Sequence, residues 1–166
     1  MGQHYLDPVQ YILDKDDDSP TDIDMDAPQQ HPDAVGSWRR IWLKYADGCE
    51  IILDGENKDI GAPFIQGPDG KLWPDLRSDI PELNQKLASL PDPEPQLTDF
   101  SAAVRSRRKF ALDEQKAFRS CTLVNLSKIA LRVGRRLELD PRKIQFVNDN
   151  EANRFISQPM RAPWHA

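Results

Sequence analysis

The chain has 166 residues, of which 39% are hydrophobic and 30% are charged, and its net charge is −5. These values are typical of a globular domain that can bury a core. No apolar run approaches the roughly 18 residues of a membrane-spanning helix, and early acidic residues exclude a secretory signal. Cys49 and Cys121 are too few and too isolated for a disulfide framework or a zinc site, so we expect a cytoplasmic protein without a membrane partner.

The charges are unevenly distributed along the chain. Residues 1–100 carry 21 acidic and 8 basic side chains, a net −13, whereas residues 101–166 carry 6 acidic and 14 basic side chains, a net +8. Binding to nucleic acid needs a basic face that nearby acids do not cancel. Because the whole chain is acidic, we expect the two parts to fold against each other and to bind no nucleic acid.

The first 35 residues predict a helix and then a loop. Gly2-Gln3-His4 has the composition of a tight turn, and Asp7-Pro8 is expected to start a helix over residues 5–14. The acidic, proline-bearing residues 14–35 predict a loop or an irregular strand. A calcium-loop pattern that starts at Asp14 fails at its glycine and terminal glutamate positions, so we expect no metal site.

Two hairpins are expected next. Residues 38–53 alternate in side-chain type on both sides of a turn at Asp47-Gly48, which is the clearest strand signal in the chain. Trp42 lies on one face of this hairpin with basic residues, and neither face is wholly polar. A shorter hairpin is expected in residues 63–75 around the turn formed by Gly67-Pro68-Asp69-Gly70.

The remaining elements are helices and two short strands. The expected helix caps are Ser78 or Asp79, Thr98, Asp113 and Asp149. The longest helix should span residues 114–134, end at Gly134 and be covered on more than one side. In the helix after Thr98, we expect Phe100, Ala103 and Val104 to face inward. Short strands are expected at 137–139 and 144–146, and residues 90–96 form a proline-rich linker.

Hairpins early in the chain and helices late, without regular alternation, predict an α+β fold. We expect a mostly antiparallel, open β-sheet with helices packed on one face. Residues 1–166 are predicted to form a single domain.

Catalytic motifs are scarce. The sequence contains no G-x-G-x-x-G loop, no phosphate-binding loop of the Walker type, and no G-x-S-x-G or H-E-x-x-H motif. Its histidines are His4, His31 and His165. His4 is the best acid–base candidate because imidazole titrates near neutral pH, although most histidines have structural or solvated roles.

Both ends of the chain resemble the family of glucose–fructose oxidoreductase, inositol dehydrogenase and rhizopine-catabolism proteins (Gfo/Idh/MocA). The stretches that carry this resemblance are GQHYLDPVQYIL, ALDEQKAFRS, NLSKIALRVGRRLELDP and NDNEANRFISQPMRAPW. The resemblance weakens between residues 55 and 95. It implies a C-terminal α+β domain that supplies part of a substrate pocket and an oligomer interface, while a separate Rossmann domain binds NAD or NADP.

The resemblance also implies which residues carry chemistry. In this family a lysine, and an Asp and a His four residues apart, handle proton transfer during hydride transfer to or from a sugar or polyol carbon. The family's histidine corresponds to His4, and the Asp position falls just before Met1, so the partner Asp and Lys are absent from this chain. We therefore expect a truncated domain that binds no cofactor and is inactive alone. Gln3 and Tyr5 flank His4 and are candidate substrate-binding residues.

Two alternatives remain open at this stage. The parent protein could be an NAD-dependent glycoside hydrolase, or the domain could be a free-standing ligand-binding or assembly module. A partly apolar open sheet face favours a homodimer or higher homo-oligomer. The sequence assigns no role to His31, Asn153 or Arg161, and it does not reveal the substrate.

Overall fold

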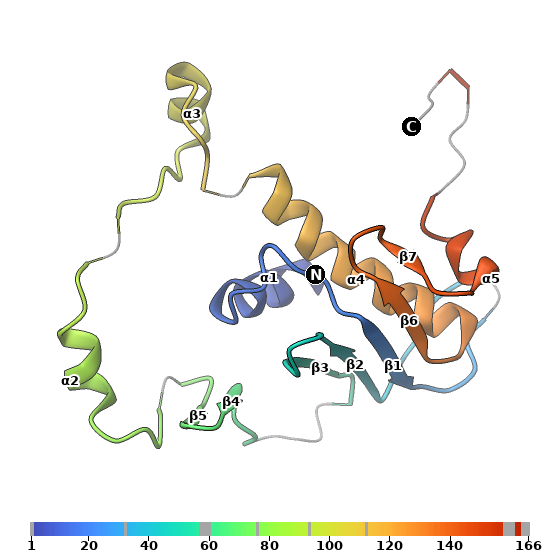
Figure 1. The fold of residues 1–166 in the computed structure, drawn as a ribbon, viewed down its shortest axis with the longest axis horizontal. Coiled ribbons are helices and arrows are strands. Elements are labelled where there is room, and N and C mark those ends of the chain that lie inside the picture. Colours follow the sequence, from blue (N-terminus) through green and yellow to red (C-terminus); the bar gives the residue numbers. More distant parts are fainter. Residues whose placement is uncertain are drawn as a thin grey trace. The chain divides into compact units, whose positions relative to one another are not determined.

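The structure, a computed structural model, describes residues 2–31, 33–56, 61–75, 77–92, 94–111, 113–157 and 162–163 (Figure 1). The chain divides into two compact units. The larger unit comprises Met1–Glu56 and Leu112–Ala166, and the smaller comprises Asn57–Ala111. The expectation that residues 1–166 form a single domain stays a prediction.

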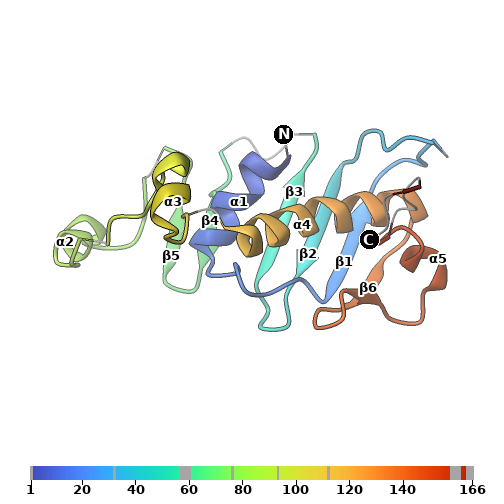
Figure 2. The same cartoon turned by 90° about the horizontal axis from the view of Figure 1, so that it is seen from above.

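The described residues of the larger unit form one sheet and three helices. Its elements are α1 (Gly2–Ile12), β1 (Asp22–Asp26), β2 (Arg40–Lys44), β3 (Glu50–Asp54), α4 (Glu114–Val133), β6 (Leu137–Asp140), β7 (Gln145–Phe146) and α5 (Asn150–Asn153). The strands form a five-stranded antiparallel sheet in the order β3-β2-β1-β6-β7. Helices α1 and α4 run along one face of this sheet (Figures 1 and 2). The predicted α+β class is therefore confirmed.

The core lies between this sheet face and the helices. Ile23 pairs with Leu43 on β2 and with Leu137 on β6, and the three side chains share a face because side chains alternate along a strand. These residues and Leu123 of α4 are at most 2% exposed. Burial of one such side chain contributes about 1.5–3 kcal/mol to the free energy of unfolding. The apolar face of the sheet is thus what holds α4 in place.

Strand β1 differs from the expected loop or irregular strand. It is a regular strand at the centre of the sheet, paired with β2 on one edge and with β6 on the other. Its alternation of aspartates with Ile23 and Met25 has the period of a strand. Strand β2 pairs with the whole of β1, whereas β6 pairs with Asp22 and Ile23. Asp22 and Asp26 lie opposite Lys44 and Arg40 of β2. These cross-strand charges offset the low strand propensity of aspartate.

Helix α1 begins earlier than expected. Gly2-Gln3-His4 is not a tight turn but the first part of the helix, and Pro8 lies inside it rather than at its start. A proline inside a helix removes one backbone hydrogen bond, and it lowers the stability of the helix by about 3 kcal/mol or more. Packing of the helix against α4 offsets that loss.

Helix α4 agrees closely with the prediction. The Asp113 side chain accepts a hydrogen bond from the backbone N–H of Lys116 at 3.0 Å, and Gly134 ends the helix with a left-handed φ of 70°. Eight residues of the helix are buried, so it is covered over much of its circumference. Its two ends also bind the acidic first part of the chain. Lys116 lies 3.9 Å from Asp16, and Arg136, just past the helix, lies 2.6 Å from Asp22.

The elements after α4 also match the prediction. β6 and β7 pair around Asp140-Pro141, and the Asp149 side chain accepts from the backbone N–H of Ala152 at 3.0 Å at the start of α5. Ile144 precedes β7 instead of belonging to it, because its φ of 52° is left-handed. Within the described part of the chain, no helix is long and apolar enough to cross a membrane.

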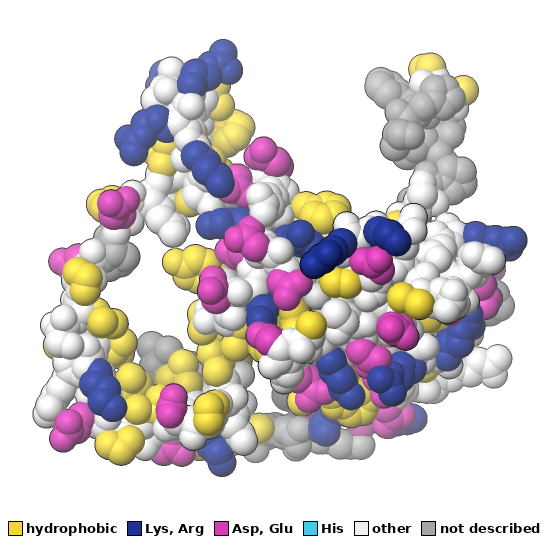
Figure 3. Space-filling view, viewed as in Figure 1, with side chains coloured by type: hydrophobic (Ala, Val, Ile, Leu, Met, Phe, Trp, Pro, Cys, Tyr) yellow, Lys and Arg dark blue, Asp and Glu magenta, His cyan; other side chains and the backbone are white. Residues whose placement is uncertain are grey.

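In the smaller unit the described residues form a hairpin and two short helices. The hairpin, β4 (Ile65–Gly67) with β5 (Gly70–Leu72), confirms the second predicted hairpin. The helices are α2 (Leu83–Ala88) and α3 (Phe100–Ser106). Among the described residues of this unit, Ala103 alone is buried. Lys and Arg side chains gather on and just after α3, which is followed by Arg107, Arg108 and Lys109 (Figure 3).

Three expectations for this unit are wrong. Ser78 and Asp79 do not cap α2, because both bind Lys71 of β5: Ser78 Oγ donates to its carbonyl at 2.8 Å, and Asp79 Oδ1 accepts from its N–H at 2.6 Å. Asp99, not Thr98, caps α3 by accepting from Ala102 at 2.9 Å.

The third error concerns the inward face of α3. Phe100 is 67% exposed and Val104 is 49% exposed, so only Ala103 of the three predicted residues faces inward. The apolar spacing was sufficient to predict a helix but not the surface that would cover it.

Candidate functional site

One side of α1 packs directly on α4. Gly2 lies against α4, since a Cβ atom there would be in ordinary van der Waals contact with Val124 Cγ2 at 3.4 Å. Gln3 Nε2 donates to Cys121 Sγ at 2.6 Å, and Ser120 Oγ donates to Asp7 Oδ1 at 2.5 Å. These contacts recur at helical spacing along α1, so the orientation of its first turn is defined by α4.

The other side of α1 faces solvent and carries the candidate acid–base residue. His4 is exposed, and Tyr5 beside it is 74% exposed. Tyr11 and Ile12 continue this exposed side toward the end of the helix. His4 and Tyr5 are thus both accessible on this side of the helix, and Gln3 is exposed as well, although its side chain is bonded to Cys121 of α4. Asp7 is neither a cap nor an exposed acid, because it lies within the helix and binds Ser120.

A cluster of charged and polar residues follows α1. Lys15 Nζ donates to Asp47 Oδ2 at 2.5 Å and lies 5.2 Å from the centre of the Tyr45 ring. The hydrogen bond from Lys15 lowers the pKa of the Asp47 carboxyl, and Asp47 in turn raises the pKa of Lys15. Burial raises the pKa of the Tyr45 hydroxyl and of the Cys49 thiol, so both are protonated at neutral pH.

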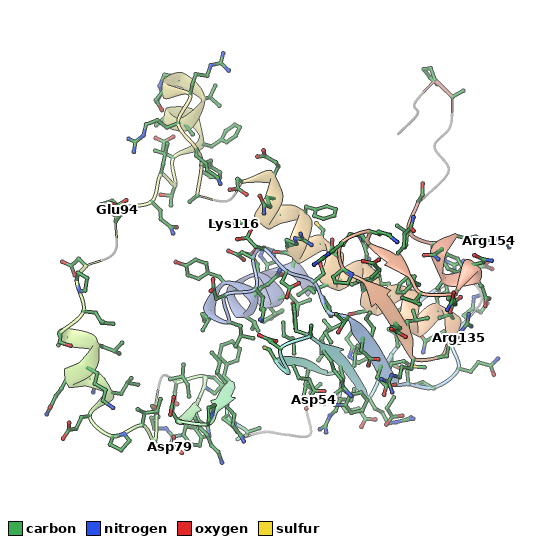
Figure 4. The ribbon with its side chains drawn as sticks, viewed as in Figure 1. Asp54, Asp79, Glu94, Lys116, Arg135 and Arg154 are labelled. Atoms are coloured by element: carbon green, nitrogen blue, oxygen red, sulfur yellow. The ribbon has the colours of Figure 1, made fainter. Side chains whose placement is uncertain are left out.

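The same region is tied to the start of α4. Arg119 Nη1 donates to Ser19 Oγ at 2.7 Å, and Gln115 Nε2 donates to Asp17 Oδ1 at 2.5 Å. Lys116, at the first turn of α4 in Figure 4, faces Asp16 of this loop. Burial raises the pKa of Asp16, although Lys116 opposes this change. No motif in the sequence marks Arg119 or Ser19 as neighbours, because they lie 100 residues apart.

The residues without an assigned role differ in their surroundings. His31 is in an exposed loop, where its Nδ1 accepts from the backbone N–H of Asp33 at 3.1 Å. Asn153 has a structural role: its side chain accepts from Phe146 N–H at 2.8 Å and donates to Phe146 C=O at 2.9 Å. It thus pairs with β7 as a neighbouring strand would. Arg161 lies outside the described residues.

A groove of about 500 Å³ runs along the solvent side of α4. None of Gln3, His4 and Tyr5 lines it. Its walls are formed by Val35, Phe118, Thr122, Asn125, Leu126, Lys128, Ile129, Arg132, Ile144, Phe155 and Ile156. In the ranges that the structure describes, no group of three or more His, Cys, Asp and Glu side chains is arranged to hold a metal ion.

The antiparallel sheet carries helices on one face, and the first helix carries an exposed histidine, so the structure is an α+β domain with His4 as its candidate acid–base residue. Over residues 1–166 the chain matches the family described as "Oxidoreductase family, C-terminal alpha/beta domain". The chain belongs to the Gfo/Idh/MocA oxidoreductase family and is a C-terminal domain of that family. The resemblance noted in the sequence is thereby confirmed. Comparison with curated proteins and with solved structures finds no match to this chain.

Membership of this family suggests NAD or NADP as the cofactor of the full-length oxidoreductase. The sequence contains no glycine-rich loop of the kind that lets a backbone approach the pyrophosphate at a helix N-terminus. We therefore assign no cofactor contact to this chain.

Proposed function

We propose that this chain is the substrate-side and oligomerisation domain of an NAD(P)-dependent sugar or polyol oxidoreductase. The observation that carries the proposal is the family match over residues 1–166, which identifies an oxidoreductase C-terminal domain. The position of His4 supports it, because an accessible imidazole is held on a helix whose opposite side is bonded to α4. A fixed helix with an exposed functional side is suited to orienting a substrate.

In this proposal His4 exchanges a proton with the substrate hydroxyl during oxidation or carbonyl reduction. Imidazole is suited to this role because its protonation changes near neutral pH. Tyr5 contributes an exposed phenol beside it, whereas Gln3 is bonded to Cys121 and would have to leave that contact to reach a substrate. The nicotinamide, bound outside this chain, supplies the hydride acceptor or donor.

The first test is an activity assay with the purified chain. It is mixed with NAD⁺ or NADP⁺ and a panel of polyols and sugars, and reduction of the nicotinamide is followed at 340 nm. We expect no turnover, because the sequence contains no glycine-rich loop of the kind that binds a dinucleotide. Turnover that depends on NAD(P) and resists further purification would contradict the proposal.

The second test examines His4 itself. The same polyols and sugars are titrated into isotope-labelled protein, and NMR shifts are compared between wild type, His4→Ala and the control His31→Ala. We expect shifts at α1 that His4→Ala removes and His31→Ala keeps, since His31 is in a separate exposed loop. Shifts confined to the groove on α4 would move the substrate site away from α1.

We also propose that the open face of the sheet is the interface of a homodimer. Its side chains alternate with those of the core along β1, β2 and β3. Ile52 is 49% exposed on this face and pairs with Trp42 on the neighbouring strand. The other outward-facing side chains of these three strands are charged, acidic on β1 and β3 and basic on β2: Asp22, Asp24, Asp26, Arg40, Lys44, Glu50 and Asp54.

A matched pair of variants tests the interface. Ile52→Glu places a charge on the open face, whereas Ile12→Glu does the same on α1, where Ile12 is similarly exposed at 52%. By analytical ultracentrifugation we expect a dimeric wild type, a monomeric Ile52→Glu variant and a dimeric Ile12→Glu variant. A monomeric wild type, or loss of the dimer only in Ile12→Glu, would contradict this interface.

A further inference from the structure

The groove along α4 changes in character from one end to the other. Its lining residues from α4 recur at helical spacing and form one stripe along the helix: Phe118, Thr122, Asn125, Ile129 and Arg132. Phe118, near the start of the helix, is 52% exposed, whereas Arg132 lies in the last turn. Lys128 lines the groove close to Arg132 in the sequence. The stripe thus runs from an aromatic end to a basic end.

The wall opposite α4 is apolar. Ile144 precedes β7, and Phe155 and Ile156 follow α5. Ile156 is 37% exposed, as is Val35, which lines the groove from the segment before β2. Removal of such apolar surface from water is favourable. A ligand with an apolar body would therefore gain contacts along both walls.

Two cations at the basic end of the groove have no carboxylate partner among the described residues. Lys128 and Arg132 are exposed, and within the described ranges neither forms an ion pair. They are four residues apart on α4, a spacing at which like charges repel each other. The carboxylates at the start of α5, Asp149 and Glu151, both pair with Arg135. An anion between Lys128 and Arg132 would offset their repulsion.

The guanidinium of Arg132 is held at the groove wall. Its Cζ atom lies 4.7 Å from the centre of the Phe155 ring, a cation–π distance. A guanidinium over an aromatic face can still donate from its edge, and its paired N–H groups match the two oxygens of a carboxylate. Among the described residues that line the groove, none is acidic. The basic end is therefore suited to a carboxylate.

The dimensions of the groove favour an extended chain over a helix. At a rise of 1.5 Å per residue, the stripe from Phe118 to Arg132 is about 21 Å long. A groove of about 500 Å³ with that length has a mean cross-section of about 25 Å². A helix with its side chains is about 10–12 Å wide, so its cross-section is about 80–110 Å². A partner helix is thus too wide for this groove.

An alkyl chain fits the groove better than an extended peptide does. A peptide brings an N–H and a C=O group at nearly every residue, and these groups need partners wherever water is displaced. The groove offers few partners, because the Thr122 hydroxyl already donates to the Phe118 carbonyl at 2.8 Å. Asn125 is the other uncharged polar side chain among the described lining residues. An alkyl chain needs no such partner.

We propose that the groove on α4 binds a carboxylate with a long alkyl chain. The carboxylate lies between Lys128 and Arg132, and the chain extends along the stripe toward Phe118. This ligand is separate from the substrate discussed above, because none of Gln3, His4 and Tyr5 lines the groove. The inference therefore does not depend on the proposed function.

A binding experiment tests the basic end. Tetradecanoate, kept below its critical micelle concentration, is titrated into the chain by isothermal calorimetry. We expect saturable binding that Lys128→Gln and Arg132→Gln each weaken about fivefold to tenfold, because each removes a charge-assisted hydrogen bond. Lys86→Gln in α2 is the control, since Lys86 is exposed and does not line the groove. Absence of binding, or equal binding by wild type and both groove variants, overturns the proposal.

The length and the head group of the ligand test its orientation. Phe118 lies about 15 Å along α4 from Lys128, a distance that tetradecanoate spans and octanoate does not. Phe118→Ala should therefore weaken tetradecanoate binding about threefold to tenfold and leave octanoate binding unchanged. Tetradecyltrimethylammonium has the same chain with a cationic head and should not bind. Binding as tight as that of tetradecanoate would reveal a non-specific apolar contact and overturn the proposal.

Two other occupants of the groove would be recognised by the same measurements. Tetradecanoate binding that appears only after removal of residues 158–166 would assign the groove to the chain's own C-terminal segment. Failure of wild type to bind tetradecanoate, together with a dimer that Phe118→Ala dissociates in the ultracentrifuge, would assign it to a second copy of the chain. Either result overturns the proposal.

Discussion

The two units of this chain differ most in what they bury. The larger unit contains every residue of the apolar core, including Ile23, Leu43 and Leu123 at 0% exposure. The smaller unit, Asn57–Ala111, buries only Ala103 among its described residues, while Phe100, Leu87 and Leu90 are more than half exposed. Secondary structure therefore forms in both units, but only the larger one has the buried area that makes a fold stable by itself.

The largest expected contrast comes from deleting apolar side chains. Ile23→Ala removes a fully buried side chain from the central strand and should lower the free energy of unfolding by about 2–5 kcal/mol. Leu87→Ala in α2 removes a side chain that is 53% exposed and should change it by less than about 0.5 kcal/mol. Urea denaturation followed by circular dichroism measures both. Equal losses would show that the smaller unit has a core of its own.

A second contrast uses two asparagines. Asn153→Ala removes both hydrogen bonds to the backbone of Phe146 in β7 and should cost about 1–3 kcal/mol, because it leaves strand groups unpaired. Asn84→Ala in α2 replaces an exposed side chain and should be neutral or slightly stabilising, since alanine favours helix. The same denaturation experiment compares them. A neutral Asn153→Ala would mean that water replaces its side chain at β7.

A third contrast uses two aspartate caps with similar geometry. Asp113 accepts from Lys116 at 3.0 Å in α4, and Asp99 accepts from Ala102 at 2.9 Å in α3. Asp113→Ala should lower the global free energy of unfolding by about 1 kcal/mol. Asp99→Ala should instead increase amide exchange within α3 and leave the global value unchanged, because α3 contributes little burial. Hydrogen exchange resolved by mass spectrometry separates the two effects.

The smallest contrast is in the pH dependence of the free energy of unfolding. The pKa of Asp149 is lowered first by the backbone N–H of Ala152 and then by Arg135. A lowered folded-state pKa contributes stability above the unfolded value of about 4, and this contribution is lost as pH falls through the folded pKa. Asp47, whose pKa Lys15 lowers, acts in the same direction.

Asp149→Asn tests this dependence because asparagine keeps the cap oxygen but loses the charge. Between pH 5 and pH 2 its unfolding midpoint should fall less steeply than that of wild type. In the smaller unit the pKa of Asp75 is lowered by Arg77, only two residues away. Asp75→Asn should therefore leave the pH dependence of global unfolding unchanged. An identical acid profile for wild type and Asp149→Asn would contradict the assigned contribution of Asp149.

The parts of the fold that the sequence predicted are those with local causes. Asp113 and Gly134 mark the two ends of α4, and Asp47-Gly48 marks the turn between β2 and β3, where Gly48 has a φ of 88°. Both hairpins and the cap at Asp149 were predicted for the same reason. In each case a few adjacent residues contain the donors, acceptors or backbone freedom that the structure uses.

The candidate site was predictable only in part. Correspondence with the family singled out His4, and the fold leaves His4 and Tyr5 exposed beside each other on α1. The orientation of Gln3 toward Cys121 was not predictable, because it depends on a contact between residues 118 positions apart. The pairing of Asn153 with Phe146 and the buried group around Tyr45 likewise have no signal in any short stretch.

By itself the sequence determined the α+β class, the ends of α4, both hairpins and membership of the Gfo/Idh/MocA family. Only the tertiary structure decided that Asp22–Asp26 is the central strand, that α1 starts at Gly2 and that Phe100 is exposed. The reason is physical. Caps and turns are stabilised by neighbouring atoms of the same segment, whereas strand position and side-chain burial depend on surfaces contributed by distant parts of the chain.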